Sequence, residues 1–353
     1  MMSGSLINLI YLIAGILFIL GIKGLTKPKT AVRGNFLSAL GMLVAVVITL
    51  FTINDVDFTY VIAGVAVGGI VGAVMALRIQ MTSMPQMVAL LNGFGGGASL
   101  SIALAEYVTR TGINPTSISD FFQPTVVAAS AFGEGAEATI ALVSISLTVL
   151  IGAVTLTGSL IAFSKLQELM KKSYGLPGGP FGNGILLLGA LAAVTFLVMN
   201  PGNTMAMVAI LGLALLLGLF LVMPIGGADM PVVIALLNSY SGIAAALAGF
   251  ILGNTVLIIA GSLVGTSGLI LTRIMCVAMN RSLANVLFGK MAAGGETIDA
   301  DEIYDGKVTS AQPDEVAMLL ETAKRVVIVP GYGMAMAQAQ HAVRELADAM
   351  ESK

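Results

Sequence analysis

Long apolar runs, separated by short polar segments, dominate the pattern along this chain. Each run has on the order of 20 residues, which is enough to cross a bilayer as an α-helix. None has a continuous polar face, so a soluble protein with this many surface helices is excluded. We therefore predict an all-α polytopic membrane bundle of about nine transmembrane helices. The expected spans are 5–22, 35–52, 61–77, 85–107, 141–164, 183–199, 204–223, 231–252 and 256–276.

Composition and charge support this class and add an orientation. The chain is 57% hydrophobic and 10% charged, and its net charge of −2 indicates no particular partner. With the N-terminus outside and nine crossings, the loops and tail on the inner side hold all 17 lysines and arginines except Arg110. Basic residues favour the inner side. We expect a multi-pass protein of a bacterial inner membrane, with the N-terminus outside and the C-terminal domain in the cytoplasm.

One apolar segment occurs twice along the chain. Residues 84–97 read MPQMVALLNGFGGG and residues 230–243 read MPVVIALLNSYSGI. Each copy places an asparagine, Asn92 or Asn238, at the same depth. A buried amide costs free energy unless it is hydrogen-bonded, so each asparagine either links two helices or orders water along a polar path. An amide cannot itself take up a proton at ordinary pH.

The duplication extends to the neighbouring spans. Each Met-Pro segment follows a span rich in glycine and alanine and precedes a span with a small polar cluster. In the second copy this cluster includes Ser267. Both three-helix units start outside and end inside, so we predict a parallel repeat, an arrangement that can build a central pathway.

Few ionisable residues lie close to the membrane spans. Asp229 precedes the second Met-Pro segment, and Glu106 lies near the end of the span that contains the first. Asp229 is equally consistent with a carboxylate held by the backbone N–H groups of a helix N-terminus and with a proton relay. Cys276 is the only cysteine, so no internal disulfide can form, and the only histidine, His341, falls in a polar C-terminal helix.

The chain becomes polar after Arg281. We predict a transmembrane domain over 1–282, a linker over 283–312 and a second domain over 313–353. The second domain contains a helix from Pro313, a buried strand at 326–329, a glycine turn and a helix over 334–351. Strand, G-x-G turn and helix open a Rossmann-like dinucleotide site, although an ordinary turn fits the spacing equally well. About 30 residues remain from the strand onward, whereas a nucleotide domain needs on the order of 100.

Four segments resemble the beta subunit of the proton-translocating NAD(P) transhydrogenase. They are GGADMPVVIALLNSYSG at 226–242, GSLVGTSG at 261–268, IMCVAMNRS at 274–282 and VVIVPGYGMAMAQAQ at 326–340. The resemblance implies hydride transfer between NAD(H), held by an alpha subunit, and NADP(H), held by the C-terminal domain of beta. It also implies coupling to proton movement, a dimer of alpha–beta units and no nucleic-acid partner. The second domain would be the start of the NADP(H)-binding domain, incomplete here, so the chain alone is expected to be inactive and not to bind NADP(H).

The resemblance also suggests roles for individual residues. Asn238 would line the proton path, Asp229 would lie near its inner mouth, and Arg281 would belong to the hinge that follows the last span. With the polar residues of the twin segments, the predicted path consists of Asn92, Asn238, Asp229, Ser239 and Ser267. The predicted NADP(H) loop consists of Gly331, Tyr332, Gly333, Met334 and Ala335.

This chain departs from the family pattern at one position of the path, and two other functions are alternatives. Some family members carry a histidine where this chain has Asn92, so the titrating group must lie elsewhere, on this chain or on a partner. Without the resemblance, the parallel repeat and the polar midplane would also fit an ion- or proton-coupled secondary transporter with a cytoplasmic regulatory tail. A non-catalytic membrane scaffold is the third alternative, and the matched asparagines argue mildly against it.

Overall fold

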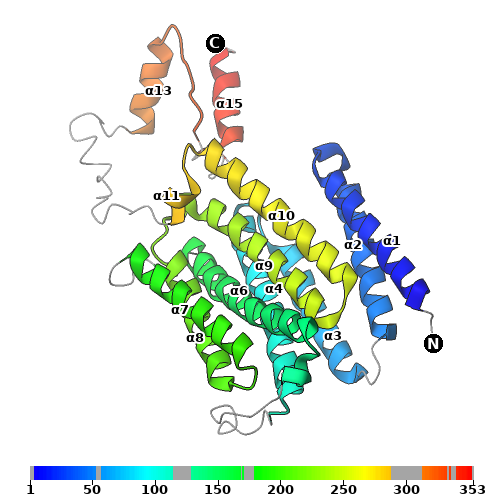
Figure 1. Ribbon diagram of the computed structural model, residues 1–353. Coiled ribbons are helices and arrows are strands. Elements are labelled where there is room, and N and C mark those ends of the chain that lie inside the picture. Colours follow the sequence, from blue (N-terminus) through cyan, green and yellow to red (C-terminus); the bar gives the residue numbers. More distant parts are fainter. Residues whose placement is uncertain are drawn as a thin grey trace. The chain divides into compact units, whose positions relative to one another are not determined.

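The computed structural model is helical throughout its membrane part (Figure 1). It describes residues 4–52, 57–113, 129–167, 169–170, 179–287, 312–331, 334 and 339–351. Within these residues, 9 helices are long and apolar enough to cross a membrane, which confirms the predicted spans. They are α1 (Gly4–Leu25), α2 (Pro28–Thr52), α3 (Phe58–Arg78), α4 (Met84–Thr111), α6 (Ala136–Leu166), α7 (Pro180–Met199), α8 (Thr204–Val222), α9 (Met230–Leu252) and α10 (Thr255–Ala278).

Local sequence explains where several of these helices begin and end. In both copies of the Met-Pro segment, proline occupies the first turn, where its missing N–H costs no helical hydrogen bond. The side chain of Asn254 accepts a hydrogen bond from the N–H of Leu257 at 3.1 Å and so caps α10. Gly253, at φ 62°, ends α9 in the left-handed conformation that glycine adopts without strain. Gly253 and Asn254 therefore form the tight turn that joins α9 to α10.

The chain divides into two compact units, residues 1–291 and 292–353. Among its described residues, the first unit also contains three short 3₁₀ helices and one short α-helix. They are η1 (Met81–Ser83), η2 (Ala129–Phe132), η3 (Gly227–Asp229) and α11 (Leu283–Leu287). The second unit contains α13 (Pro313–Thr322) and α15 (Gln340–Glu351).

The second unit confirms one sequence prediction and contradicts another. Helix α13 begins at Pro313 as expected, and its Glu315 side chain accepts a hydrogen bond from the N–H of Gln312 at 3.1 Å. The predicted strand at 326–329 is wrong for this structure, because none of the described residues lies in a β-ladder. An apolar run forms a strand only when a neighbouring strand takes up its N–H and C=O groups. No Rossmann-like α/β domain is therefore present among the described residues.

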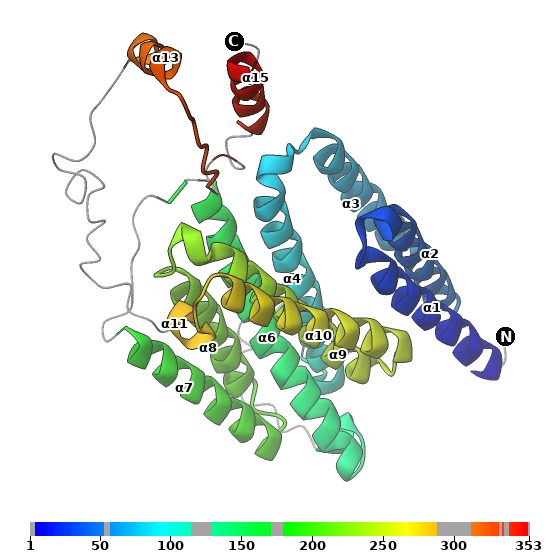
Figure 2. The same ribbon diagram turned by 90° about the horizontal axis from the view of Figure 1, so that it is seen from above.

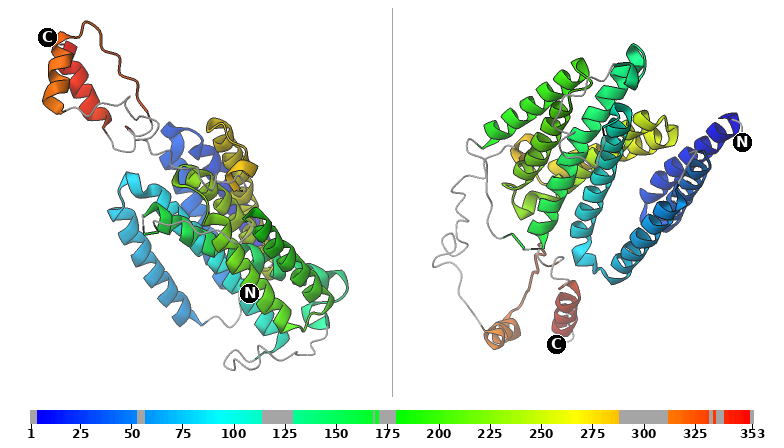
Figure 3. Two further views of the ribbon diagram at one scale, coloured as in Figure 1. Left: turned by 90° about the vertical axis from the view of Figure 1, so that its left-hand side faces the viewer. Right: turned by 90° about the horizontal axis from the view of Figure 1, so that it is seen from below.

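Helix α6 is at the centre of the first unit. It packs against α4, α8 and α9, and α9 in turn packs against α10. The α1–α2 pair lies at one edge and joins the rest through α10, while α7 packs on α8 (Figures 2 and 3). Helix α3 has no buried residue. The core around α6 thus brings the two Met-Pro helices, α4 and α9, together.

The duplicated sequence is reflected in matched helix contacts. A methyl group added at Gly96 of α4 would lie 2.9 Å from the carbonyl oxygen of Gly152 in α6. A methyl group added at Gly242 of α9 would lie 2.8 Å from the carbonyl oxygen of Gly261 in α10. Gly96 and Gly242 are equivalent, at an offset of 146 positions. The α4–α6 and α9–α10 pairs therefore cross at the same register, with backbones as close as small residues allow.

The first helix of each predicted unit does not share this packing. Helix α8 packs on α6 and α7, whereas its predicted equivalent, α3, buries no residue. The matched contacts therefore extend to two helices of each unit.

Candidate proton path between the two Met-Pro helices

Asn92 links the two copies of the repeat. Its side chain is buried, and its Nδ2 donates a hydrogen bond to the carbonyl oxygen of Ile234 in α9 at 3.1 Å. In an α-helix this oxygen also accepts the N–H of the residue four positions on, which here is Asn238. The amide of one copy is therefore held against the turn that leads to the amide of the other.

The two Met-Pro helices meet at equivalent residues. A methyl group added at Gly95 of α4 would lie 3.6 Å from Cβ of Ser241 in α9, and the two positions differ by 146. Parallel helices that meet at equivalent residues are related by a local twofold axis along their length. This relationship supports a repeat around an axis along the membrane normal.

The two asparagines break this local symmetry. The counterpart of the Asn92–Ile234 bond would run from the side chain of Asn238 to the carbonyl oxygen of Val88. No such bond forms, and the half-buried Asn238 side chain makes no hydrogen bond within the part of the chain that the structure describes. Its backbone oxygen accepts the hydroxyl of Ser241 at 2.8 Å. One amide is thus engaged between helices and the other is open.

Ser239 lies in the α9–α10 interface. Its side chain is fully buried, and its hydroxyl donates to the carbonyl oxygen of Gly265 at 2.6 Å. A methyl group added at Gly268 would lie 2.8 Å from Cα of Ser239. These contacts give Ser239 a packing role between two helices.

Ser267 lies on an exposed face of α10 in this chain. Its hydroxyl donates to the carbonyl oxygen of Val264, in the same helix, at 2.9 Å. The described contacts therefore do not bring Ser267 together with Asn92 or Asn238.

Asp229 pairs with the residue predicted to form the hinge. Its Oδ2 lies 2.8 Å from Nη1 of Arg281, and the exposed fractions of the two side chains are 14% and 52%. Although Asp229 precedes the first residue of α9, it makes no capping hydrogen bond to that helix. Its second oxygen, Oδ1, is buried and without a partner among the described residues. The guanidinium, not the helix N-terminus, is therefore what holds this carboxylate.

The end of α10 positions Arg281 for this ion pair. Asn280 has a φ of 51°, and its N–H donates to the carbonyl oxygen of Val277 at 3.1 Å. The N–H of Arg281 donates to the carbonyl oxygen of Cys276 at 2.9 Å. These two bonds form a Schellman motif, which reverses the chain after the helix. The motif directs Arg281 back toward the start of α9.

The structure adds a residue that sequence reasoning did not select. The ammonium group of Lys165, in the last turn of α6, donates to the carbonyl oxygens of Met223 and Ile225, the latter at 2.8 Å. These oxygens follow the last turn of α8, where a cation is favourable. The position of Lys165 in the last turn of α6 was a signal for a contact with a helix C-terminus, although the sequence did not show which helix that would be.

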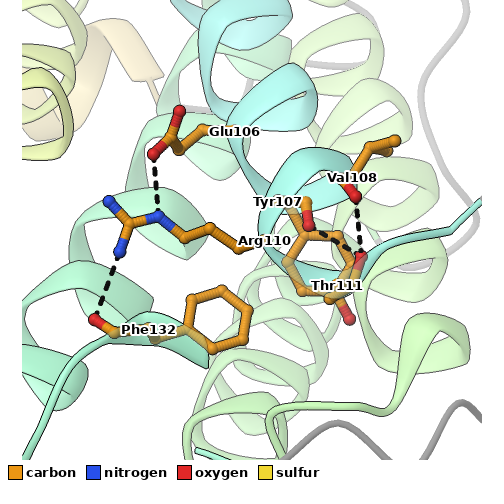
Figure 4. A network of polar contacts seen from close by, with 6 residues as sticks. All are labelled: Glu106, Tyr107, Val108, Arg110, Thr111 and Phe132. Carbon is orange, nitrogen blue, oxygen red and sulfur yellow. Dashed lines mark hydrogen bonds and ion pairs between the residues drawn. The ribbon is translucent and has the colours of Figure 1, made fainter. Parts of the chain in front are cut away.

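At the opposite end of α4, Glu106 and Arg110 form a second carboxylate–guanidinium pair. Oε1 of Glu106 lies 2.7 Å from Nε of Arg110, and Nη1 of Arg110 donates to the carbonyl oxygen of Phe132 at 3.2 Å (Figure 4). Sequence reasoning noted Glu106 as an ionisable residue close to the membrane spans and assigned it no role.

The predicted NADP(H) loop is only partly described. Tyr332, Gly333 and Ala335 lie outside the described residues. The N–H of Met334 donates to the carbonyl oxygen of Gly331 at 3.1 Å, and a methyl group added at Gly331 would meet nothing within 4 Å. The space beside Gly331 would admit a close ligand, but without a sheet the described residues do not form a nucleotide site.

Comparison with known proteins identifies the family. A family model described as NAD(P) transhydrogenase beta subunit matches residues 7–353. The chain belongs to this family. The NAD(P) transhydrogenase subunit beta of Rhodospirillum rubrum is 41% identical over 357 residues, which cover 100% of this chain and 73% of the relative. A second sequence of the same description, from a named strain of that species, matches with the same figures.

Membership of the NAD(P) transhydrogenase beta subunit family implies transhydrogenase activity as part of a complex. It also implies an alpha subunit as partner and the use of NAD(H) and NADP(H). The spans described above make this chain a membrane subunit.

Proposed function

We propose that this chain conducts protons along the α4–α9 crossing and couples that movement to hydride transfer from NAD(H) on the alpha subunit to NADP(H) on its own C-terminal domain. The observation that carries the proposal is the broken symmetry of the two amides. Asn92 is fixed by its bond to Ile234, while Asn238 keeps its amide available for water. A fixed amide and an open amide side by side would order water molecules in the membrane interior.

Asp229 and Arg281 form the inner mouth of the path in this proposal. The pair joins the start of α9 to the residues that follow α10, so movement of the chain beyond α10 would pull on Arg281. While paired with Arg281, the Asp229 carboxylate would be engaged. When the pair separates, the carboxylate would be open to the path. This connection would link nucleotide binding to proton access, with Arg281 as the hinge residue. Ser239 and Ser267 keep supporting positions on α9 and α10.

The proposed orientation places the N-terminus outside and the C-terminal domain in the cytoplasm of a bacterium. The positive-inside distribution supports it. Polar contacts also join helix ends that would share a side of the membrane. Lys165 contacts Ile225 at the inner ends of α6 and α8, and the hydroxyl of Tyr107 donates to Pro201 O at 3.2 Å at the outer ends of α4 and α7.

The nucleotide roles rest on the resemblance and on the open space beside Gly331. Gly331, Tyr332, Gly333, Met334 and Ala335 would belong to the NADP(H) loop at the start of a Rossmann-like domain. The two cofactors supply the hydride chemistry, and the protein positions them. We extend the proposal to a dimer of alpha–beta units, active only with alpha subunits present.

Reconstitution of the full-length protein with alpha subunits into vesicles tests this function. An imposed proton gradient directed toward the nucleotide side should accelerate NADPH formation from NADH, and a gradient of opposite sign should slow it. NADPH formation that ignores both gradients would refute the coupling. A protonophore control should remove the difference between the two gradients while the exchange reaction continues.

A further inference from the structure

Glu106 and Arg110 are ionisable residues inside a membrane-spanning helix. Both precede Gly112, which ends α4, and about a quarter of each side chain is exposed. Ionisable groups within a span are costly and mark functional positions more often than packing positions. The Glu106 carboxylate is thus partly removed from water and held by a single guanidinium at 2.7 Å.

Glu106 continues a polar line that starts at Asn92. Asn92, Ser99 and Glu106 are spaced seven residues apart on α4. Seven residues turn a helix almost two full turns, so the three side chains share one side of it, with a rise of about 10 Å at each step. Ser99 is buried, and its hydroxyl donates to the carbonyl oxygen of Gly95 at 3.1 Å. The line runs from the membrane interior to the outer end of the helix.

The second copy of the repeat lacks this line. At an offset of 146 positions, Ser99 corresponds to Ala245 and Glu106 to Leu252. The shared helix packing therefore does not require a hydroxyl or a carboxylate at these positions. Conversely, Asp229 at the start of α9 corresponds to Ser83 in the first copy. Each Met-Pro helix is thus associated with one carboxylate, Glu106 in the last turns of α4 and Asp229 directly before α9, at opposite ends of the bundle.

We propose that Glu106 is the outer proton-binding group of the path, and that Arg110 positions it. This inference rests on the proposed proton-translocating function. Glu106 exchanges a proton with water outside, and the proton passes by way of Ser99 to the water ordered by Asn92 and Asn238. Glu106 lies about 21 Å from Asn92 along α4, and Asp229 about 14 Å from Asn238 along α9, so the carboxylates are separated by roughly the 30 Å hydrocarbon core.

The surroundings hold this pair in place. Arg110 donates to the carbonyl oxygen of Phe132, and the ring centroids of Phe132 and Tyr107 lie 6.0 Å apart. Among the described elements packed against this end of α4, η2 and the last two turns of α9 carry no titratable side chain. Glu134 and Glu137, at the start of α6, are exposed. Asp120 lies outside the described residues. Arg110 is therefore the charged partner that the described contacts give to Glu106.

The test uses the full-length complex with alpha subunits in vesicles, with nucleotides added only to the medium. Only complexes whose nucleotide domains face the medium then react, and their Glu106 faces the lumen. NADPH formation is driven by a fixed potassium diffusion potential while the lumen pH is varied. The variants are Glu106→Gln, Glu106→Asp and the control Glu137→Gln, which removes an exposed carboxylate at the same end. A double variant, E106Q/R110Q, removes both charges and serves if the single variant fails to assemble.

We expect Glu106→Gln, or the double variant, to lower the driven rate by about tenfold or more and to abolish its dependence on lumen pH. Glu106→Asp should retain that dependence, and Glu137→Gln should match the wild type. A glutamine variant with the wild-type rate and lumen-pH response would overturn the inference. A wild type that does not respond to the potential would instead refute the proposed function, so the two failures are distinguishable.

Discussion

Nδ2 of Asn92 in α4 donates a hydrogen bond to the carbonyl oxygen of Ile234 in α9 at 3.1 Å, and the equivalent bond from Asn238 is absent. Two residues at matched positions of a repeat therefore have different tasks. The engaged amide joins the helices, and the open amide is free to bind water.

Asn92→Leu should destabilise the membrane unit by about 1 kcal/mol, because it removes an interhelical hydrogen bond inside the membrane. Thermal unfolding of the purified protein in detergent measures this change. Asn238→Leu is the matched comparison and should shift the unfolding midpoint less, since no hydrogen bond from its side chain is lost. Equal shifts for the two variants would argue against the asymmetry.

Gly242→Ala should destabilise the α9–α10 pair by about 1 to 3 kcal/mol, because there is no room for the added methyl group. That group would clash with the backbone nitrogen of Gly265. Gly64→Ala in α3 is the control, since a methyl group there meets nothing within 4 Å. Urea or thermal unfolding in detergent should separate the two variants, and similar stabilities would contradict the close packing.

The Asp229–Arg281 pair should contribute little to stability but much to coupling. Arg281 is half exposed, so a double-mutant cycle with Asp229→Asn and Arg281→Gln should give an interaction energy of about 1 kcal/mol or less. Each single variant should nevertheless reduce gradient-driven NADPH formation more than exchange without a gradient. Equal loss in both assays would assign the pair a structural role only.

Asn280→Gly should preserve both stability and coupling, whereas Asn280→Val should weaken both. The φ of 51° suits glycine and asparagine, and a β-branched residue there costs about 1 to 2 kcal/mol. Valine would also disturb the turn that directs Arg281 toward Asp229. Thermal unfolding and the gradient assay check the two effects, and a valine variant with wild-type coupling would show that the turn does not position Arg281.

The sequence predicted the spans because their length and hydropathy follow directly from the thickness of the bilayer. It could not predict which helices touch, because an apolar run indicates that a helix lies in the membrane but not which helices surround it. The bond from Asn92 ends on a backbone oxygen, and no residue identity marks that acceptor. The Asn280 turn had a weak signal, an asparagine just beyond a helix.

The site predictions had mixed outcomes for similar reasons. Asp229 and Arg281 were selected separately, and the structure joins them. Ser239 was selected for its position beside Asn238, but successive residues on a helix point about 100° apart, and Ser239 faces α10. The apolar run at 326–329 was interpreted as a strand from composition alone, and the described residues provide no neighbouring strand.

The most direct test of the central claim is gradient-driven NADPH formation by vesicles that contain the full-length complex with Asn238→Leu. Leucine has the same branching and the same number of side-chain heavy atoms as asparagine but cannot hydrogen-bond to water. We predict that the variant assembles, binds NADP(H) and catalyses exchange without a gradient, but loses the acceleration by an imposed proton gradient. An Asn238→Leu complex that responds to the gradient as the wild type does would contradict a proton path at the α4–α9 crossing.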